Sequence, residues 1–101
     1  MPGFEVEAQG DIHIEGNVES GLVTSTHGNI KIEGGVLGKH TSYIKAHKNI
    51  DVGYAQGAEL YAEKNIFFNL YLLNCTSIAK DTIKSQRNNA FIAGGLAKAQ
   101  S

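Results

Sequence analysis

The chain has 101 residues with a net charge of −1 and 42% hydrophobic residues, so it forms at most one modest domain. Nine basic and ten acidic residues are spread along it, which excludes the basic patch of a protein that binds nucleic acid or an anionic membrane. The most apolar stretch, residues 66–73, is too short to span a bilayer, so membrane insertion is not expected. The single cysteine, Cys75, excludes an internal disulfide and fits a reducing compartment such as the cytoplasm.

Four similar phrases recur along the chain. They are GDIHIEGN from Gly10, GNIKIEGG from Gly28, KNIDVG from Lys48 and KNIFFN from Lys64. The steps between their isoleucines are 18, 20 and 16 residues, and the isoleucines are Ile12, Ile30, Ile50 and Ile66. Repeats of this size are typical of a solenoid, in which each turn of chain, here called a coil, stacks on the coil before it.

Apolar residues alternate with other residues around each isoleucine, which predicts short strands with one face turned inward. A position that recurs in successive coils is here called a column. Inward columns are expected two residues after, four residues before and six residues before the isoleucine. Their members are Ile14, Ile32, Val52 and Phe68; Ala8, Thr26, Ala46 and Ala62; and Val6, Thr24, Ile44 and Leu60. Ile78 and Ile83 are five residues apart where six are expected, which predicts a one-residue deletion or a bulge.

A polar residue stands directly before each isoleucine: Asp11, Asn29, Asn49 and Asn65. Such side chains bond readily to nearby backbone and, when stacked, can form a hydrogen-bonded ladder. The sequence therefore predicts an all-β fold, a single-stranded, right-handed parallel β-solenoid of about five coils of 16–20 residues. The whole chain, residues 1–101, forms one domain, with residues 94–101 as a C-terminal cap or a frayed tail.

The succession GDIHIEGNV, GNIKIEGGVLG, YIKAHKNIDVGYAQGAELYAEKNI, NCTSIAKDTI and FIAGGLAKA resembles the central domain of the flagellar assembly protein A (FapA) family. The resemblance covers residues 6–99. Its more specific part is the order of two Gly-rich coils followed by GA, NC and a final GG. It implies a bacterial cytoplasmic protein built of imperfect β-solenoid repeats, without defined catalytic residues. Family members usually add an N-terminal domain and a C-terminal helical region, so an excised domain or a stand-alone relative is expected.

The resemblance implies a non-catalytic structural scaffold or protein-interaction module without a cofactor, linked to flagellar assembly or to its cellular placement. A second resemblance, to the bactofilins, implies a polymer-forming cytoskeletal solenoid instead. A third alternative is an enzyme similar to the left-handed β-helix acyltransferases, which use a hexapeptide repeat and a catalytic histidine. The 20- and 16-residue coils break the six-residue count, so catalytic residues are not expected.

Histidines provide the main candidate for chemistry. His27 and His47 hold the same corner position in successive coils, and Glu63 holds it in the next. Stacked imidazoles with a carboxylate are a candidate metal site, but exposed corner residues are the simpler interpretation, and no metal ion is expected. Cys75 has no cationic neighbour that would activate a thiol, so we expect a buried small hydrophobe.

A protein partner or self-association is expected. The residue between the first two inward positions of each coil faces solvent, and an aromatic residue, Phe67, holds this position in the fourth coil. Exposed aromatic side chains often mark contacts, so either the C-terminal segment Leu96–Ala99 or a partner is expected to cover Phe67, with Tyr71 and Leu73 in the same surface. Solenoid ends also expose unpaired strand edges, which predicts a homo-oligomer.

Overall fold

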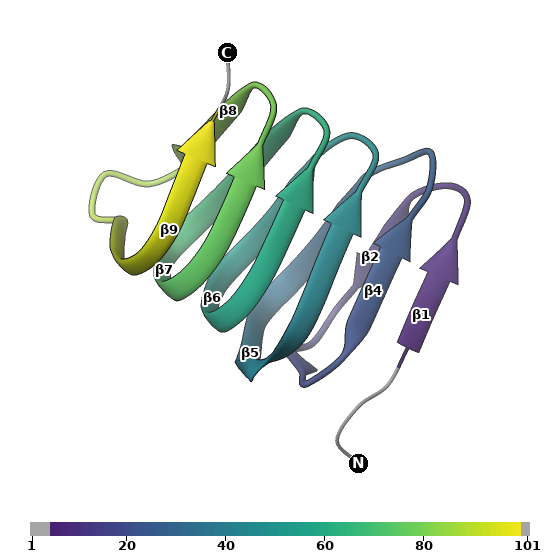
Figure 1. Cartoon of the computed structure of the whole chain (residues 1–101), viewed down its shortest axis with the longest axis horizontal. Coiled ribbons are helices and arrows are strands. Elements are labelled where there is room, and N and C mark those ends of the chain that lie inside the picture. Colours follow the sequence, from purple (N-terminus) through teal and green to yellow (C-terminus); the bar gives the residue numbers. More distant parts are fainter. Residues whose placement is uncertain (1–4, 100–101) are drawn as a thin grey trace.

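The computed structural model describes residues 5–99, apart from the side chains of residues 39–41, and shows a parallel β-solenoid (Figure 1). Its nine strands are β1 (Glu5–Ala8), β2 (Ile12–Ile14), β3 (Val18–Glu19), β4 (Leu22–Ser25), β5 (Ile30–Ala46), β6 (Ile50–Ala62), β7 (Asn65–Ala79), β8 (Thr82–Ser85) and β9 (Phe91–Ala99). All eight strand pairings are parallel. The predicted fold class is confirmed. Within residues 5–99 there is no helix that could cross a membrane.

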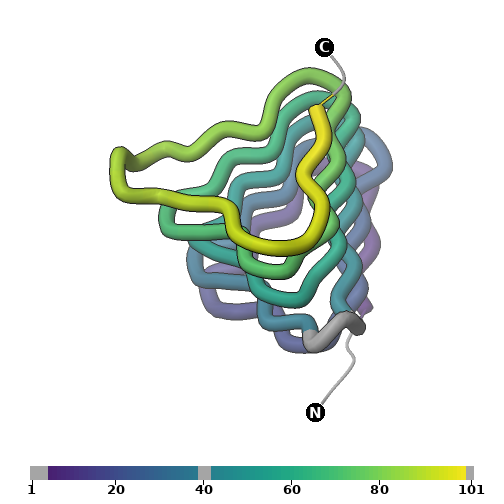
Figure 2. Tube along the Cα trace, turned by 60° about the vertical axis from the view of Figure 1, so that its left-hand side comes forward, coloured from purple at the N-terminus to yellow at the C-terminus, as the bar shows by residue number. Residues whose placement is uncertain are grey.

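The winding of the solenoid is right-handed. In Figure 1, β1, β4 and β9 lie with the final parts of β5, β6 and β7 in the near sheet, all pointing the same way, and the chain returns behind them as the coils advance from β1 to β9. Successive coils superpose when the molecule is turned, and the last coil lies at one end of the stack (Figure 2). Register shifts interrupt the pairing of β5 with β6 at two places, between Ile32 and Gly35 and between Leu37 and Ser42.

Aliphatic side chains fill the interior in columns. In the isoleucine column each residue pairs with the one in the next coil, in the order Ile12, Ile30, Ile50, Ile66 and Ile83. The coils therefore measure 18, 20, 16 and 17 residues. Ile30, Ile50 and Ile66 are fully buried. Removing one such side chain from water contributes about 1.5–3 kcal/mol, so repetition along the column stabilises a small domain whose core, among the described residues, is mostly aliphatic and includes Phe68.

The expected inward positions in the second coil are wrong by one residue. Val23 and Ser25 are buried, whereas Thr24 is partly exposed and Thr26 is exposed. The corner that follows β4 is one residue longer than the others. Ser25 at the end of β4 is five residues before Ile30, whereas the last residues of β1, β5 and β6 are each four residues before the next isoleucine. The Ser25 hydroxyl donates to the Gly10 carbonyl at 2.6 Å and accepts the Gly28 N–H at 3.0 Å, so it satisfies backbone groups of the longer corner. Because side chains alternate along a strand, one extra corner residue turns the neighbouring positions inward.

The deletion or bulge expected between Ile78 and Ile83 is not at that place. Ser77 pairs with Leu60, Ala79 with Ala62 and Ile83 with Ile66, so the register is continuous there. The register shift in the pairing of β6 with β7 lies earlier, between Val52 and Tyr54, where β7 has one extra residue between Phe68 and Tyr71. The five-residue step arises because Ile78 lies outside the inward column, which Ser77 occupies and where it is 1% exposed. A small polar residue in an apolar column concealed the regular spacing.

One corner explains the GA, NC and GG phrases. Gly57, Asn74 and Gly94 have positive φ angles of 65°, 52° and 68°. Glycine adopts this region without steric cost, and asparagine tolerates it better than most residues. In the next position, Cys75 pairs with Gly95, where a β-carbon would collide with the Cys75 backbone. The phrases therefore mark a left-handed corner followed by a small residue.

The C-terminal segment forms the last strand. Residues 94–99 lie in β9, which pairs with Tyr71–Ala79 of β7 and adds a coil to the near sheet. Residues 100 and 101 of the expected cap or tail lie outside the described residues. Leu96–Ala99 pair with Thr76–Ala79 and do not cover Phe67, so that part of the expectation is wrong.

Candidate functional site

The polar column before the isoleucines forms a hydrogen-bonded ladder. The first three members each accept a backbone N–H from the next coil: Asp11 Oδ1 from Asn29 at 2.8 Å, Asn29 Oδ1 from Asn49 at 3.0 Å, and Asn49 Oδ1 from Asn65 at 3.1 Å. Side-chain amides of Asn29 and Asn65 add bonds to the preceding member at 3.3 and 3.1 Å. The ladder satisfies corner N–H groups from within the stack, so its role is structural.

Phe67 lies between charged neighbours on the outer surface. It pairs with Asp51 in the coil before and Lys84 in the coil after, and it is partly buried. A side-chain hydrogen bond between Gln86 and Asp51 bridges the coil that carries Phe67. Burial raises the pKa of the Asp51 carboxyl, although Lys31 and the bond to Gln86 act in the opposite direction. Phe67 is thus partly exposed in the single molecule, with a charged residue on each neighbouring coil.

Tyr71 and Leu73 belong to a different part of the surface from Phe67. Tyr71 lies between Tyr54, at a ring-centroid distance of 5.3 Å, and Phe91, at 5.5 Å, while Leu73 pairs with Gln56 and Ala93. The row of Tyr54, Tyr71 and Phe91 is here called the aromatic row. It ends at Phe91, which is 51% exposed. The structure thus places two of the three predicted interface residues beside each other and leaves Phe67 on the preceding strand segment.

The candidate metal ligands do not come together as a set. The rings of His27 and His47 lie in successive coils with centroids 6.0 Å apart. The Glu63 carboxylate instead pairs with Lys80 at 2.6 Å, and this contact lowers the pKa of Glu63. In the described part of the chain, no group of three His, Cys, Asp or Glu side chains could hold a metal ion.

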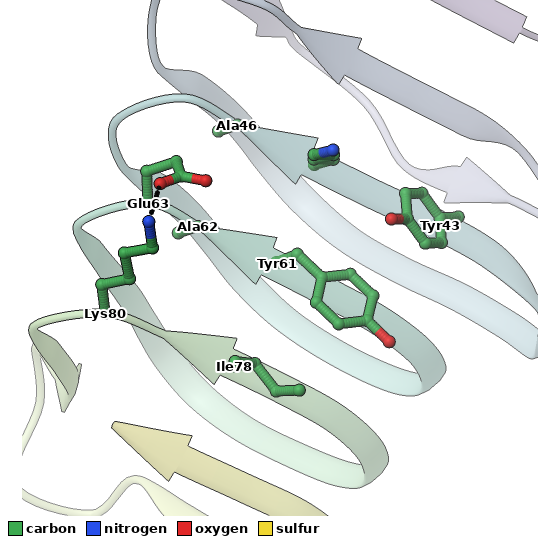
Figure 3. Close-up of a pocket in the computed structure, with 8 residues that line it drawn as sticks. Tyr43, Ala46, Tyr61, Ala62, Glu63, Ile78 and Lys80 are labelled. Carbon is green, nitrogen blue, oxygen red and sulfur yellow. Dashed lines mark ion pairs between the residues drawn. The ribbon is translucent and has the colours of Figure 1, made fainter. Parts of the chain in front are cut away.

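A groove that the sequence analysis missed crosses the near sheet (Figure 3). It has a volume of about 220 Å³ and follows the ends of three successive strands, with Tyr43 from β5, Tyr61 from β6 and Ile78 from β7. The two tyrosine rings are 5.1 Å apart, and the Glu63–Lys80 ion pair closes one end of the groove. The available signal was a tyrosine beside the inward residue in both SYIKA and LYAEK.

Hydrogen bonding fixes the second tyrosine of this groove. The Tyr61 hydroxyl donates to Glu59 Oε1 at 2.9 Å, and this bond raises the pKa of the phenol. A fixed, amphipathic ring loses little conformational entropy when another surface packs against it. The groove is open, so its geometry suits a side chain of a protein partner better than an enclosed small molecule.

Cys75 is buried in the core as the sequence predicts. Burial raises the pKa of its thiol, and the thiol donates to the Leu73 carbonyl at 3.3 Å. A raised pKa keeps the sulfur protonated near neutral pH, and the thiolate is the reactive form.

Comparison with known proteins identifies the family. The family model described as the Flagellar Assembly Protein A beta solenoid domain matches residues 1–101. The chain belongs to the FapA family. The match spans the whole chain, so the aromatic row and the tyrosine groove both lie within the matched domain. A comparison with curated proteins and one with solved structures found no match.

Proposed function

We propose that this FapA-family chain is a non-catalytic scaffold or protein-interaction module that acts in flagellar assembly, or in placing the flagellum, in the bacterial cytoplasm. The family itself links the chain to flagellar assembly. The observation that supports a binding role is the aromatic row, which lies on a rigid parallel sheet and ends in an exposed Phe91. Tyrosine and phenylalanine are enriched at the cores of protein interfaces.

The proposal that the chain is not an enzyme rests first on the 20- and 16-residue coils, which break the six-residue count of the acyltransferase repeat. Cys75 is buried, and its pKa is raised rather than lowered, so it is poorly suited to act as a nucleophile. Isothermal titration with acetyl-CoA tests the acyltransferase alternative directly. We expect no saturable heat, and tight binding would contradict a purely structural role.

Site-specific photo-crosslinking in flagellated cells tests the binding role. A photoreactive residue at position 71 should capture a component of flagellar assembly, because Tyr71 lies at the centre of the aromatic row. The same residue at position 48 is the matched control, because Lys48 is exposed at a corner away from that row. The photoreactive residue at position 67 tests separately whether the surface around Phe67 contacts the same partner as Tyr71. Loss of the gene without any effect on the number or position of flagella would overturn the proposal.

A further inference from the structure

The nine basic and ten acidic residues nearly cancel over the whole chain, but they are not distributed evenly along the solenoid axis. The first 30 residues carry five acidic residues and neither lysine nor arginine: Glu5, Glu7, Asp11, Glu15 and Glu19. From residue 64 onward there are five basic residues, Lys64, Lys80, Lys84, Arg87 and Lys98, and one acidic residue, Asp81. Because the coils stack in chain order, the end that begins with β1 is acidic and the end that finishes with β9 is basic.

The strands at both ends have a free edge. Among residues 5–99, β1 pairs with β4 alone and β9 pairs with β7 alone, so each has one edge without a strand partner. Ile92 pairs with the buried Leu72, yet it remains 45% exposed because no coil lies beyond it. At the opposite end, Ile12 and Val18 are already buried, so the first coil offers chiefly the backbone edge and carboxylates of β1. Free edges of this kind accept a further strand.

The columns of the near sheet predict how two ends would meet. One column begins with Val6 and continues, coil by coil, through Val23, Ile44, Leu60, Ser77 and Ala97. A second column begins with Ala8 and continues through Ser25, Ala46, Ala62, Ala79 and Ala99. If β1 of a second copy continues this register beyond β9, Val6 stacks on Ala97 and Ala8 on Ala99. The residue between them, Glu7, then stacks on Lys98. Both Glu7 and Lys98 are exposed in the single molecule.

We infer that the partner of each solenoid end is a second copy of this chain, joined head to tail through pairing of β9 in one copy with β1 in the next. Continued stacking places Glu7 of one copy and Lys98 of the other about 4.8 Å apart along the sheet. Within one molecule, five coil spacings separate the acidic and basic ends, well beyond the Debye length of about 8 Å at physiological salt. Glu7 and Lys98 therefore interact only across the junction between two copies. A head-to-tail contact of this kind does not close on itself and produces filaments.

The proposed junction and the aromatic row share Phe91, which begins β9 and ends the row, whereas Tyr54 and Tyr71 lie in earlier coils away from the junction. The charges also determine which ends of two copies join. Joining two β1 ends would bring acidic residues together, and joining two β9 ends would bring basic residues together, so charge repulsion disfavours both arrangements.

Sedimentation velocity of the purified chain tests the inference through charge reversal. The weight-average sedimentation coefficient should rise with concentration at low salt and fall when salt is added. Glu7→Lys and Lys98→Glu should each weaken self-association by roughly three- to thirtyfold, because opposite charges across a sheet become like charges. An equimolar mixture of the two variants should recover association, since every junction of an alternating filament then joins one positive and one negative side chain.

Lys48→Glu is the matched control, because it makes the same change in net charge as Lys98→Glu at a corner in the middle of the stack. It should associate as the unaltered chain does, and unchanged melting temperatures should show that all variants are folded. Electron microscopy should show filaments in the mixture and in the unaltered chain at raised concentration. A chain that stays monomeric at low salt at all concentrations would overturn the inference. So would variants that each associate normally on their own, because that result would indicate a junction without the Glu7–Lys98 contact.

Discussion

The Oδ1 atom of Asn49 accepts two hydrogen bonds from Asn65 in the next coil, one from the backbone N–H and one from the side-chain amide, both at 3.1 Å. The backbone N–H of Asn49 in turn donates to Asn29 Oδ1 at 3.0 Å. Asn49 therefore connects three coils at one corner. Because each of these corner N–H groups has its acceptor in the preceding coil, the corners help the strands to hold the coils in register.

Asn49→Ala removes the acceptor of both bonds from Asn65. We expect a loss of about 1–3 kcal/mol in the free energy of unfolding, because a partly buried backbone N–H loses its partner. Asn49→Asp keeps an acceptor, as Asp11 does at the start of the ladder, and should lose less. Urea denaturation measures both. Asn89→Ala in the exposed turn between β8 and β9 is the control, and an equal loss there would show that the ladder contributes nothing specific.

The corrected register of the second coil gives a test with adjacent residues. Val23→Asp places a carboxylate among fully buried aliphatic side chains and should cost several kcal/mol, enough to unfold a marginal domain. Thr24→Asp places the same group on the outer surface, where changes usually stay within about 0.5 kcal/mol. Circular dichroism melting of the two variants distinguishes the registers. A cooperative, native-like melt of Val23→Asp together with unfolding of Thr24→Asp would restore the register expected from the sequence.

Gly94 tests the left-handed corner. Its φ of +68° disfavours residues with a β-carbon, and that β-carbon would also collide with the Asn74 side chain. Gly94→Ala should therefore lose about 1–2 kcal/mol in the free energy of unfolding. Gly10→Ala is the control, since a β-carbon there would meet open space. Thermal unfolding that shows equal stability for the two variants would contradict the assigned corner conformation.

Asp51 gives a pH-dependent prediction. Burial raises the pKa of its carboxyl above the ordinary value of 3.8, so the folded state binds the proton more tightly than the unfolded chain does. The stabilisation linked to this proton is complete below about pH 3.8 and is lost as the pH rises through the folded-state pKa. Asp51→Asn cannot ionise. Its melting temperature should exceed that of the unaltered chain at pH 7, and the difference should disappear near pH 3.

The control for this experiment is Glu15→Gln, which neutralises an exposed carboxylate elsewhere on the solenoid. We expect its melting temperature to follow that of the unaltered chain across the same pH range. If Asp51→Asn melts below the unaltered chain at pH 7, then the attraction of Lys31 and the hydrogen bond to Gln86 outweigh burial, and the pKa of Asp51 is lowered rather than raised.

Local pattern was sufficient to determine the fold. The period of two around Ile12, Ile30, Ile50 and Ile66 specifies strands with one buried face, and steps of 16–20 residues require those strands to stack in parallel coils. The polar residue before each isoleucine specifies the ladder, because only a short side chain with an acceptor can serve the corner of the next coil. The GA, NC and GG phrases marked the family resemblance in the sequence, and the structure shows that they form a left-handed corner, a conformation that few residues adopt.

Tertiary structure alone decided which side chains face inward where the corner lengths vary. Thr24, Ser25 and Thr26 are similar in size and polarity, so the sequence could not show that Ser25 is buried, and the bond from Ser25 to Gly10 exists only when two coils are stacked. The same holds for Ser77, whose place in an apolar column depends on pairing with Leu60. The tyrosine groove and the surroundings of Phe67 also depend on neighbouring coils. Residues 16–20 positions apart become neighbours only when each strand edge finds its partner, and that pairing also directs the C-terminal segment to β7 rather than to Phe67.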